Sequence, residues 1–289
     1  MQEIIYFLPG QGAETPSLGK KLFEKFPLSF NLLNLTEKIW GFDLREIILN
    51  GSDNIYDIIY CQPILCWYGY SLGLALKEKY KIKILVPYSL GVFPSIALAE
   101  ILPFEDIIKI LKFNFDLVNK LDLSGKLLYV SGYPIEEAKK NLKGIYFSSI
   151  NHPLSYTIGG KEEEIKEAYN FLKEKAFSLK ILPSPWPIHT KILKEVSEEL
   201  KKEEYLWKNL KDPTIPILSP IDISLIDNKD KGKFLLSSVI SKPMFFNSIC
   251  KKLKNEKIKF IEASESGFFQ KIFKLHNRDI KIFEGIGEI

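Results

Sequence analysis

Ser89 stands where a predicted strand runs into a turn, a position from which a serine hydroxyl can act as a nucleophile. The apolar segment Ile82–Pro87 is typical of a buried strand, and Leu90–Ala99 is expected to form a helix. This strand–turn–helix layout, with a glycine two residues after the serine, matches a nucleophile elbow, although Pro87 replaces the elbow's first glycine. A serine that caps a helix fits the same local pattern. The segment therefore predicts either a nucleophile or a helix cap at Ser89.

A serine nucleophile needs a base at neutral pH, and the chain offers three histidines. His276 lies in a lysine-rich segment and is expected on the surface, while His152 lies in a loop expected to connect two strands. His189 ends a proline-rich passage between two predicted domains, which places it at the mouth of a cleft. We therefore predict that His189 is the base for Ser89.

The loop after the first predicted strand offers a further group for the same reaction. It reads Pro9-Gly10-Gln11-Gly12-Ala13, and its glycines let the backbone approach a ligand closely. The loop lacks the lysine of a P-loop and the third glycine of a Rossmann turn, which argues against nucleotide binding. It is consistent with an oxyanion-binding loop and also with an ordinary loop.

Alternating strands and helices are expected to position these residues. Strands are expected at Ile4–Leu8 and Ile82–Pro87, and helices at 19–38, at Gln62–Lys77 (opened by Pro63), at Leu90–Ala99 and at Phe104–Leu123. Such alternation favours a parallel sheet covered by helices.

The pattern changes near Gly125, where the order of expected elements becomes βαββαβ, as in a ferredoxin-like unit. The strands are expected at Leu127–Ser131, Ile145–Ser149, Tyr156–Gly159 and Phe177–Leu182, and the helices at Pro134–Asn141 and Lys161–Lys175. We therefore predict a large α/β-hydrolase-like domain with a parallel sheet, formed by residues 1–124 and 187–289. The small ferredoxin-like α+β subdomain, residues 125–186, is inserted into it. Ligand sites favour the cleft between two such domains.

The composition narrows the class of protein. Of the 289 residues, 46% are apolar and 26% charged, which is ordinary for a globular protein. No apolar run is long enough to cross a bilayer, and the N-terminus lacks the basic region of a signal peptide. The net charge of +4 comes from scattered lysines, with only Arg45 and Arg278 as arginines, which argues against nucleic-acid binding. The three cysteines fit no metal spacing, so we expect reduced thiols, no bound metal and a cytoplasmic protein.

These segments, in this order, resemble the malonyl-CoA:acyl carrier protein transacylase family over essentially the whole chain. Phe7–Glu14 is similar to the family's F-P-G-Q-G-S-Q motif, Cys61-Gln62-Pro63 to its T-Q-P, and Tyr88–Phe93 to its G-H-S-L-G-E-Y elbow. Asn151-His152-Pro153 and Ile158-Gly159-Gly160 resemble its N-S-P and I-A-G pair, and Pro187-Ile188-His189 resembles its P-S-H. Ser89 and His189 are 100 residues apart, close to the family's usual spacing.

The resemblance implies a mechanism in which Ser89 attacks an acyl thioester while His189 takes its proton. The backbone N–H groups of Gln11 and Leu90 would hold the oxyanion. Backbone carbonyls near Ser219-Pro220 and in the segment 238–240, rather than a carboxylate, would orient the imidazole.

The resemblance also implies the partners of the reaction. Coenzyme A and the phosphopantetheine of an acyl carrier protein would carry the acyl group as thioester substrates, and no cofactor would be permanently bound. We also expect a monomer that binds neither nucleic acid nor membranes.

One departure from the family pattern bears on the acyl group. Counted without gaps from Ser89, the arginine that holds the malonyl carboxylate in the family corresponds to Asn114. An amide cannot form a bidentate charged pair with a carboxylate. Lys112 lies about 200° around the same helix, and neither arginine of the chain aligns with the position. We therefore predict a non-carboxylated acyl group, with a lysine from elsewhere in the fold as the alternative.

Further departures lie at the elbow itself. Tyr88 and Val92 replace a histidine and a glutamate of the family, so we expect a less charged pocket rim. The substrate-binding residues that the resemblance implies are Asn114, Gln62, Tyr88, Asn151 and Ile188.

Four functions remain open from the sequence. The first is an acyltransferase for a non-carboxylated acyl group, and the second is an acyl-carrier-protein thioesterase of a polyketide or fatty-acid system, with water as the acceptor. The third is a malonyl-CoA:acyl carrier protein transacylase with an unusual pocket. The fourth is a degenerate chain kept as a binding partner, which the retention of Gln11, Ser89 and His189 argues against.

Overall fold

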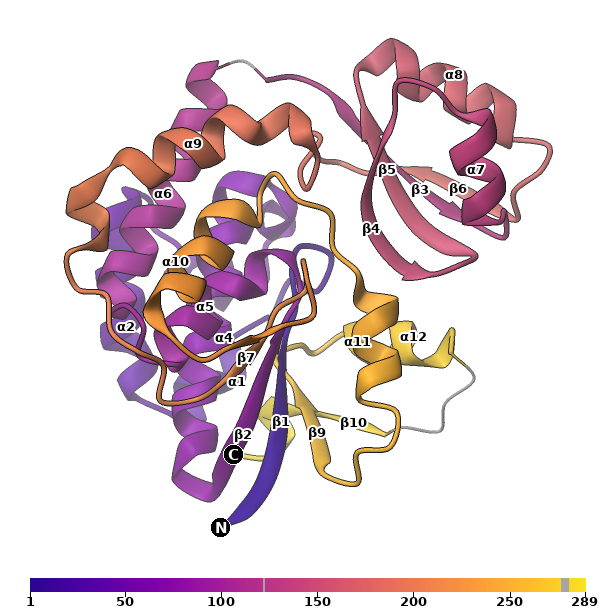
Figure 1. Cartoon of the computed structure of the whole chain (residues 1–289). Coiled ribbons are helices and arrows are strands. Elements are labelled where there is room, and N and C mark those ends of the chain that lie inside the picture. Colours follow the sequence, from indigo (N-terminus) through magenta and orange to yellow (C-terminus); the bar gives the residue numbers. More distant parts are fainter. Residues whose placement is uncertain (122, 277–280) are drawn as a thin grey trace.

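The strand before the Pro9 loop lies beside the strand before Ser89, at the centre of a six-stranded sheet (Figure 1). The computed structural model describes residues 1–121, 123–276 and 281–289. In it, β1 (Gln2–Leu8) pairs in parallel with β2 (Tyr80–Pro87). Every residue from Ile4 to Leu8 is fully buried, as expected of an apolar strand covered on both faces. Because both strands end at the same edge of the sheet, the loops that carry Gln11 and Ser89 meet there.

The remaining strands widen this sheet in the order β10-β9-β1-β2-β7-β8. Three of them, β9 (Lys259–Glu262), β10 (Ile282–Glu284) and β7 (Ile217–Leu218), join it in parallel. The short strand β8 (Leu225–Ile226) pairs antiparallel with β7 at one end. The predicted α/β class with a largely parallel sheet is therefore confirmed.

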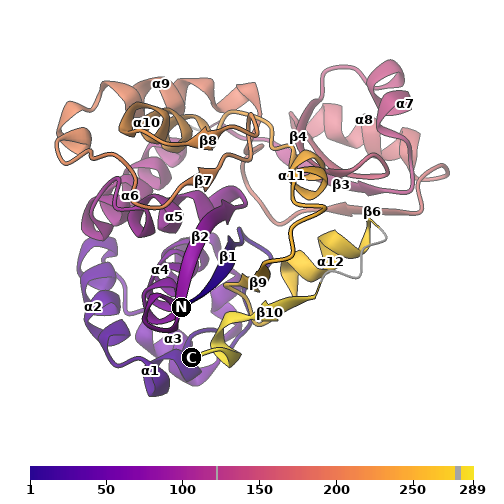
Figure 2. The same cartoon turned by 60° about the horizontal axis from the view of Figure 1, so that its bottom comes forward.

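Most helices of the large domain are stacked on one side of this sheet, while α11 and α12 flank β9 and β10 (Figures 1 and 2). The helices are α1 (Lys20–Lys25), α2 (Leu28–Trp40), α3 (Arg45–Asn50), α4 (Ile58–Lys79), α5 (Val92–Leu98), α6 (Phe104–Leu121), α9 (Lys194–Lys202), α10 (Lys229–Ser238), α11 (Phe246–Lys252) and α12 (Phe268–Lys274). Helices α2, α4, α5 and α6 contact one another in pairs and cover the region around Ser89.

Two helix boundaries differ from those expected. The helix predicted at 19–38 is divided into α1 and α2 near Pro27. The helix expected to open at Pro63 begins one turn earlier, so this proline lies inside α4. Proline has no N–H to donate to the carbonyl of Ile59 four residues before it. The indole N–H of Trp40 donates to that carbonyl instead, at 2.6 Å, which lets the helix continue through the proline.

A second sheet forms the small subdomain, drawn at the upper right of Figure 1. Its elements are β3 (Lys126–Ser131), α7 (Ile135–Asn141), β4 (Tyr146–His152), β5 (Ser155–Gly160), α8 (Glu162–Leu172) and β6 (Ser178–Ile181). The strand order β4-β5-β3-β6, with antiparallel neighbours, is that of a ferredoxin-like sheet and confirms the predicted βαββαβ unit. The subdomain has its own apolar core beneath α7 and α8. The exact division at residues 125 and 186 remains a prediction.

The small subdomain meets the large domain along β4. Its backbone forms a short parallel bridge with Met244, in the segment between α10 and α11, and β4 also contacts α11. No helix in the described part of the chain has the length and apolar character needed to cross a membrane.

Candidate active site

Ser89 lies on a sharp turn between β2 and α5. Its backbone has a φ of 53°, a left-handed conformation that residues other than glycine adopt at an energetic cost. Two glycines let this turn pack against the Pro9 loop. A Cβ atom on Gly91 would overlap the carbonyl oxygen of Leu8, and a Cβ atom on Gly10 would lie 2.8 Å from that of Ser89. The close contact between the two loops holds Ser89 in the strained conformation of an elbow.

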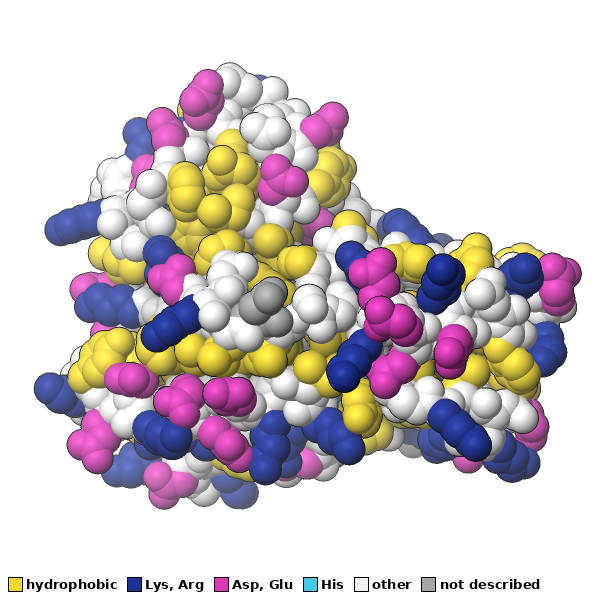
Figure 3. All heavy atoms as spheres, turned by 90° about the horizontal axis from the view of Figure 1, so that it is seen from above, with side chains coloured by type: hydrophobic (Ala, Val, Ile, Leu, Met, Phe, Trp, Pro, Cys, Tyr) yellow, Lys and Arg dark blue, Asp and Glu magenta, His cyan; other side chains and the backbone are white. Residues whose placement is uncertain are grey.

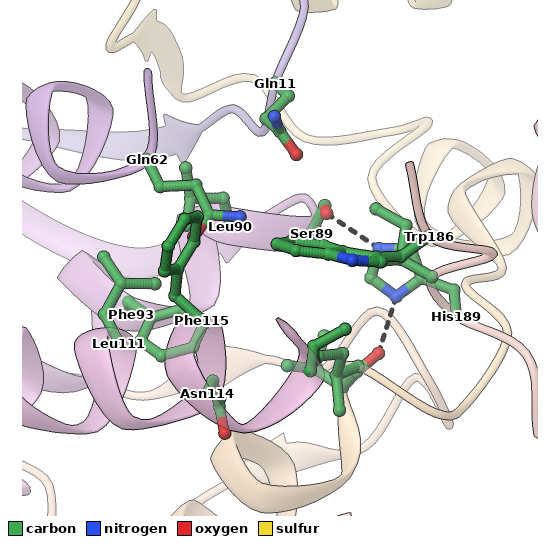
Figure 4. A pocket seen from close by; sticks show the side chains of 14 residues that line it. Gln11, Gln62, Ser89, Leu90, Phe93, Leu111, Asn114, Phe115, Trp186 and His189 are labelled. Atoms are coloured by element: carbon green, nitrogen blue, oxygen red, sulfur yellow. Dashed lines mark hydrogen bonds between the residues drawn. The ribbon is translucent and has the colours of Figure 1, made fainter. Parts of the chain in front are cut away.

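The hydroxyl of Ser89 faces the imidazole of His189 (Figure 4). Ser89 Oγ and His189 Nε2 are 2.7 Å apart. On the other side of the ring, Nδ1 lies 2.6 Å from the carbonyl oxygen of Val239. If Nδ1–H donates to that carbonyl, Nε2 is left as the acceptor for the serine proton. Of the two segments that the family resemblance implied, 238–240 supplies this carbonyl. Ser89 therefore contacts a base, and its side chain does not cap the following helix.

His189 is kept neutral by its surroundings. The side chain is 4% exposed, and this burial lowers its pKa to about 4, although the hydrogen bond with Val239 acts in the opposite direction. Burial disfavours the charged imidazolium because it removes the ring from water. A neutral imidazole at pH 7 is the form that can take a proton from Ser89.

The other two histidines lie together, away from Ser89. His152 is the last residue of β4, not part of a loop as expected, and its ring centre lies 5.2 Å from that of His276. His276 is partly exposed, and its Nε2 lies 2.7 Å from the carbonyl oxygen of Asn151. Both rings belong to the contact between the subdomain and the end of α12.

A pocket opens beside Ser89 and His189. Rings of Phe93, Phe115 and Trp186 form much of its wall (Figure 4). The lining residues are Gln11, Gln62, Ser89, Leu90, Phe93, Leu111, Asn114, Phe115, Val118, Trp186, Ile188, His189, Val239 and Ile240. None of these residues is a lysine, an arginine, an aspartate or a glutamate. The pocket thus presents an apolar, uncharged surface to a group attached to Ser89.

The pocket contains most of the predicted site residues. Gln11 and Leu90, predicted to donate their N–H groups to an oxyanion, both line it next to Ser89. Gln62, Asn114 and Ile188, predicted to contact the substrate, line it as well.

Asn114 supplies a neutral polar group to the far end of this pocket (Figure 4). It lies on α6, is 5% exposed, and its Oδ1 has no hydrogen-bond partner among the described residues. The cations considered as substitutes lie elsewhere. Lys112 forms an ion pair with Asp116 at 2.6 Å, and Arg45 is engaged by Glu37. Arg278 lies outside the described residues. The lining that the structure describes therefore offers no cation to an acyl carboxylate.

Tyr88 and Asn151 do not line the pocket, although both were assigned to substrate binding. Tyr88 points away from it into an aromatic cluster with Phe246 and Phe268, with ring centres 5.3 Å apart in each pair. Burial in this cluster raises the pKa of its hydroxyl, which faces the side chains of Ser149 and Asn151. Val92 is fully buried and does not shape the rim either. Tyr88 is the last extended residue and Ser89 begins the left-handed turn, so the two side chains leave the chain in different directions.

Sequence reasoning missed most of the apolar lining. Leu111, Phe115 and Val118 share the inner face of α6 with Asn114, and helical periodicity around Asn114 could have identified them. Trp186 also lines the pocket, and its position three residues before His189 is the one sequence feature that could have indicated this.

Comparisons with known proteins find relatives over nearly the whole chain. No model of a protein family matches the chain. The chain is 24% identical to the malonyl CoA-acyl carrier protein transacylase of Bacillus subtilis over 97% of its length and 92% of that protein. It is 26% identical to the polyketide biosynthesis acyltransferase homolog PksD of the same organism, over 92% of this chain and 85% of the relative.

The solved structures include a malonyl-transacylase in complex with a type II polyketide-synthase acyl carrier protein. The chain matches it with a TM-score of 0.83 at 17% identity, over 95% of this chain and 92% of that one. The chain therefore has the fold of the malonyl-CoA transacylases, and its relatives in sequence are malonyl-CoA–acyl carrier protein transacylases and polyketide acyltransferases.

Proposed function

We propose that the protein is a serine acyltransferase that moves a non-carboxylated acyl group between thioesters of coenzyme A and an acyl carrier protein. The observation that carries this proposal is the contact of 2.7 Å between Ser89 Oγ and His189 Nε2 at the mouth of an uncharged pocket. A serine nucleophile in contact with its base is an arrangement suited to acyl transfer. The uncharged pocket lining favours a neutral acyl group.

In the first half-reaction, Ser89 Oγ attacks the thioester carbonyl carbon while its proton passes to Nε2 of His189. The imidazolium that forms is stabilised by the Val239 carbonyl, which lies 2.6 Å from Nδ1. The N–H groups of Gln11 and Leu90 are the proposed donors to the tetrahedral oxyanion. When the carbon–sulfur bond breaks, the sulfur takes the proton from Nε2 and leaves as a thiol. The acyl group remains as an ester on Ser89.

In the second half-reaction, an acceptor thiol gives its proton to Nε2 and attacks the ester. Ser89 Oγ then leaves and recovers the proton, which restores the starting state. The names of the relatives, which pair malonyl-CoA with acyl carrier protein, support coenzyme A and carrier phosphopantetheine as the two thiols. These substrates suit a cytoplasmic monomer that needs no permanently bound cofactor.

The proposed preference for a neutral acyl group rests on the pocket wall. A malonyl carboxylate placed there would lose its hydration and meet the amide of Asn114 instead of a cation. Burial of a charge without a partner is unfavourable by roughly several kcal/mol of free energy. A saturated acyl chain loses no such hydration and gains apolar contacts with Leu111, Phe115 and Val118.

The test is to incubate the protein with carrier protein loaded with acetyl, butyryl, hexanoyl or malonyl groups and to follow its intact mass. We expect the mass of one neutral acyl group to appear on the native protein and to be absent from Ser89→Ala. After the donor carrier protein is removed, release of that group only when a carrier thiol is added supports transfer. Release into water without a thiol would identify a hydrolase, and rapid modification by malonyl alone would contradict the proposed acyl group.

A further inference from the structure

Met244 connects the small subdomain to the nucleophile. It lies in the segment between α10 and α11, which passes beside β4 (Figures 1 and 2). Its backbone N–H donates to the carbonyl of Ser148 at 2.9 Å, and its carbonyl accepts from the N–H of Ile150 at 2.8 Å. Its side chain is 1% exposed, and its sulfur accepts the backbone N–H of Ser89 at 3.1 Å. One residue thus bonds to β4 through its backbone and to Ser89 through its side chain.

The Ser89 N–H needs this acceptor because neither β1 nor β7 supplies one. The bonds between β1 and β2 continue as far as Tyr88, whose N–H donates to the carbonyl of Leu8 at 2.8 Å. Tyr88 is extended (φ −125°, ψ 121°), so the following N–H, that of Ser89, points to the side opposite β1, where β2 pairs with β7 only at Leu85. A thioether sulfur is a weak acceptor, but a buried N–H without any partner carries a desolvation penalty. The bond to Met244 therefore stabilises the conformation that presents the hydroxyl.

Tyr88 adds a second connection to the same strand. Its hydroxyl faces Ser149 and Asn151 on β4, and its ring is packed against Phe246, which follows Met244 by two residues. Ser148, Ser149 and Asn151 are all buried. Strand β4 is thus connected to both elbow residues. Its side chains face the hydroxyl of Tyr88, and Met244 connects it to the backbone N–H of Ser89.

We propose that Met244 is a positioning residue: it transmits the position of β4 to the backbone of Ser89 and so maintains the conformation in which Ser89 is acylated. The proposal rests on the proposed function, because it presumes that Ser89 is the nucleophile. It assigns the subdomain a part in the rate of the reaction.

The composition of the chain makes a test unusually specific. The sequence contains only two methionines, Met1 and Met244, and Met1 is 85% exposed at the N-terminus. Biosynthetic replacement of methionine by norleucine therefore exchanges one buried sulfur for a methylene of nearly the same shape. Replacement by selenomethionine keeps an acceptor atom at that place and serves as the conservative rescue. Met244→Leu is the genetic counterpart if the norleucine protein does not fold.

We expect norleucine to lower kcat for acyl transfer roughly three- to tenfold, the rate equivalent of one weak hydrogen bond, with KM unchanged. Selenomethionine should leave kcat close to that of the native protein. Ile249→Val, a small change in the buried face of α11, is the control for a loss of stability alone, and it should leave kcat unchanged. An unchanged kcat in the norleucine protein would overturn the proposal.

A second readout follows the Ser89 amide without turnover. The chain contains only two Tyr-Ser pairs, Tyr70-Ser71 and Tyr88-Ser89, so labelling with ¹³C-carbonyl tyrosine and ¹⁵N-serine selects two amide signals. Loss of the acceptor should move the Ser89 signal upfield and leave that of Ser71, inside α4, in place. A fall in kcat with both signals unmoved would mean that Met244 acts only by filling space. If no acyl thioester modifies the native protein, the proposed function is wrong. The shift of the Ser89 signal still tests whether Met244 accepts the Ser89 N–H.

Discussion

Ser89 lies between two regions of different character. One is the acyl pocket, whose lining is uncharged and mostly apolar, with Asn114 as a neutral polar group at its far end. The other is the interface with β4, where Tyr88, Met244 and Asn151 make polar and backbone contacts and do not touch the pocket. The pocket is the proposed place of the acyl group, whereas the interface contacts the side chain of Tyr88 and the backbone of Ser89. Changes in the pocket should therefore alter the choice of thioester, and changes in the interface should alter the rate for every thioester alike.

The largest effect is expected where the two regions meet. Ser89→Ala and His189→Ala should each lower turnover of every acyl thioester by roughly four to six orders of magnitude, as losses within such a unit typically do. Steady-state kinetics with acetyl- and hexanoyl-loaded carrier protein measures the loss. His152→Ala is the matched control, because that ring lies in the interface with α12. Substantial turnover by Ser89→Ala would show that another group is the nucleophile.

A smaller but selective effect is expected at Asn114. Asn114→Arg should raise kcat/KM for malonyl relative to acetyl thioesters by roughly ten- to a hundredfold, the equivalent of one charge-assisted hydrogen bond pair. The ratio of the two substrates in a direct competition is the measurement. Asn119→Arg adds the same charge to an exposed position of α6 and should leave the ratio unchanged. An unaltered ratio in Asn114→Arg would mean that this position does not select the acyl group.

The contact between Ser89 and His189 could be predicted from sequence because each partner is defined by local chain geometry. Ser89 is set by a strand that must turn, and His189 by a proline-rich re-entry into the large domain. Even the carbonyl that accepts from His189 came from the expected segment, at Val239. The βαββαβ order was equally readable, because strand and helix periodicities differ over short stretches.

The interface could not be predicted in this way. Tyr88 adjoins Ser89 in sequence, yet its ring packs against Phe246, outside the pocket lining. Met244 is 155 residues from Ser89, and no periodicity connects the two. Contacts between distant segments depend on how the subdomain is seated, which local patterns do not encode. The family resemblance placed Tyr88 and Asn151 at the substrate for the same reason: a motif gives position along the chain, not direction.

The buried imidazole makes a prediction about pH. Because burial lowers the pKa of His189 to about 4, the base should stay neutral, and acylation should continue, well below pH 6.5. At pH 5 the native enzyme should retain most of its kcat/KM, whereas a base with an ordinary imidazole pKa would retain roughly 3%. Activity should then fall as the pH drops through about 4.

The pH–rate profile of Ser89 acylation, measured with a rapid quench to avoid acid unfolding, gives this pKa. Circular dichroism at each pH serves as the control for unfolding. An acid limb near pH 6.5 would mean that His189 is hydrated in the working enzyme, contrary to its burial in the pocket wall.

The smallest effect should separate the pocket from the interface most cleanly. Trp186 packs against Phe115, with ring centres 5.6 Å apart, and limits the space available to an acyl chain. Trp186→Phe removes part of this wall, so each methylene accommodated in the new space should raise kcat/KM for the longer chain by about fourfold. Trp207→Phe, an equally buried tryptophan outside the pocket lining, is the control and should not change the order of chain lengths.

Norleucine at position 244 should lower the rates for acetyl and hexanoyl by the same factor, because the interface does not contact the acyl chain. If norleucine changed chain-length preference, or Trp186→Phe slowed all chains equally, the division between a selecting pocket and a positioning interface would be wrong.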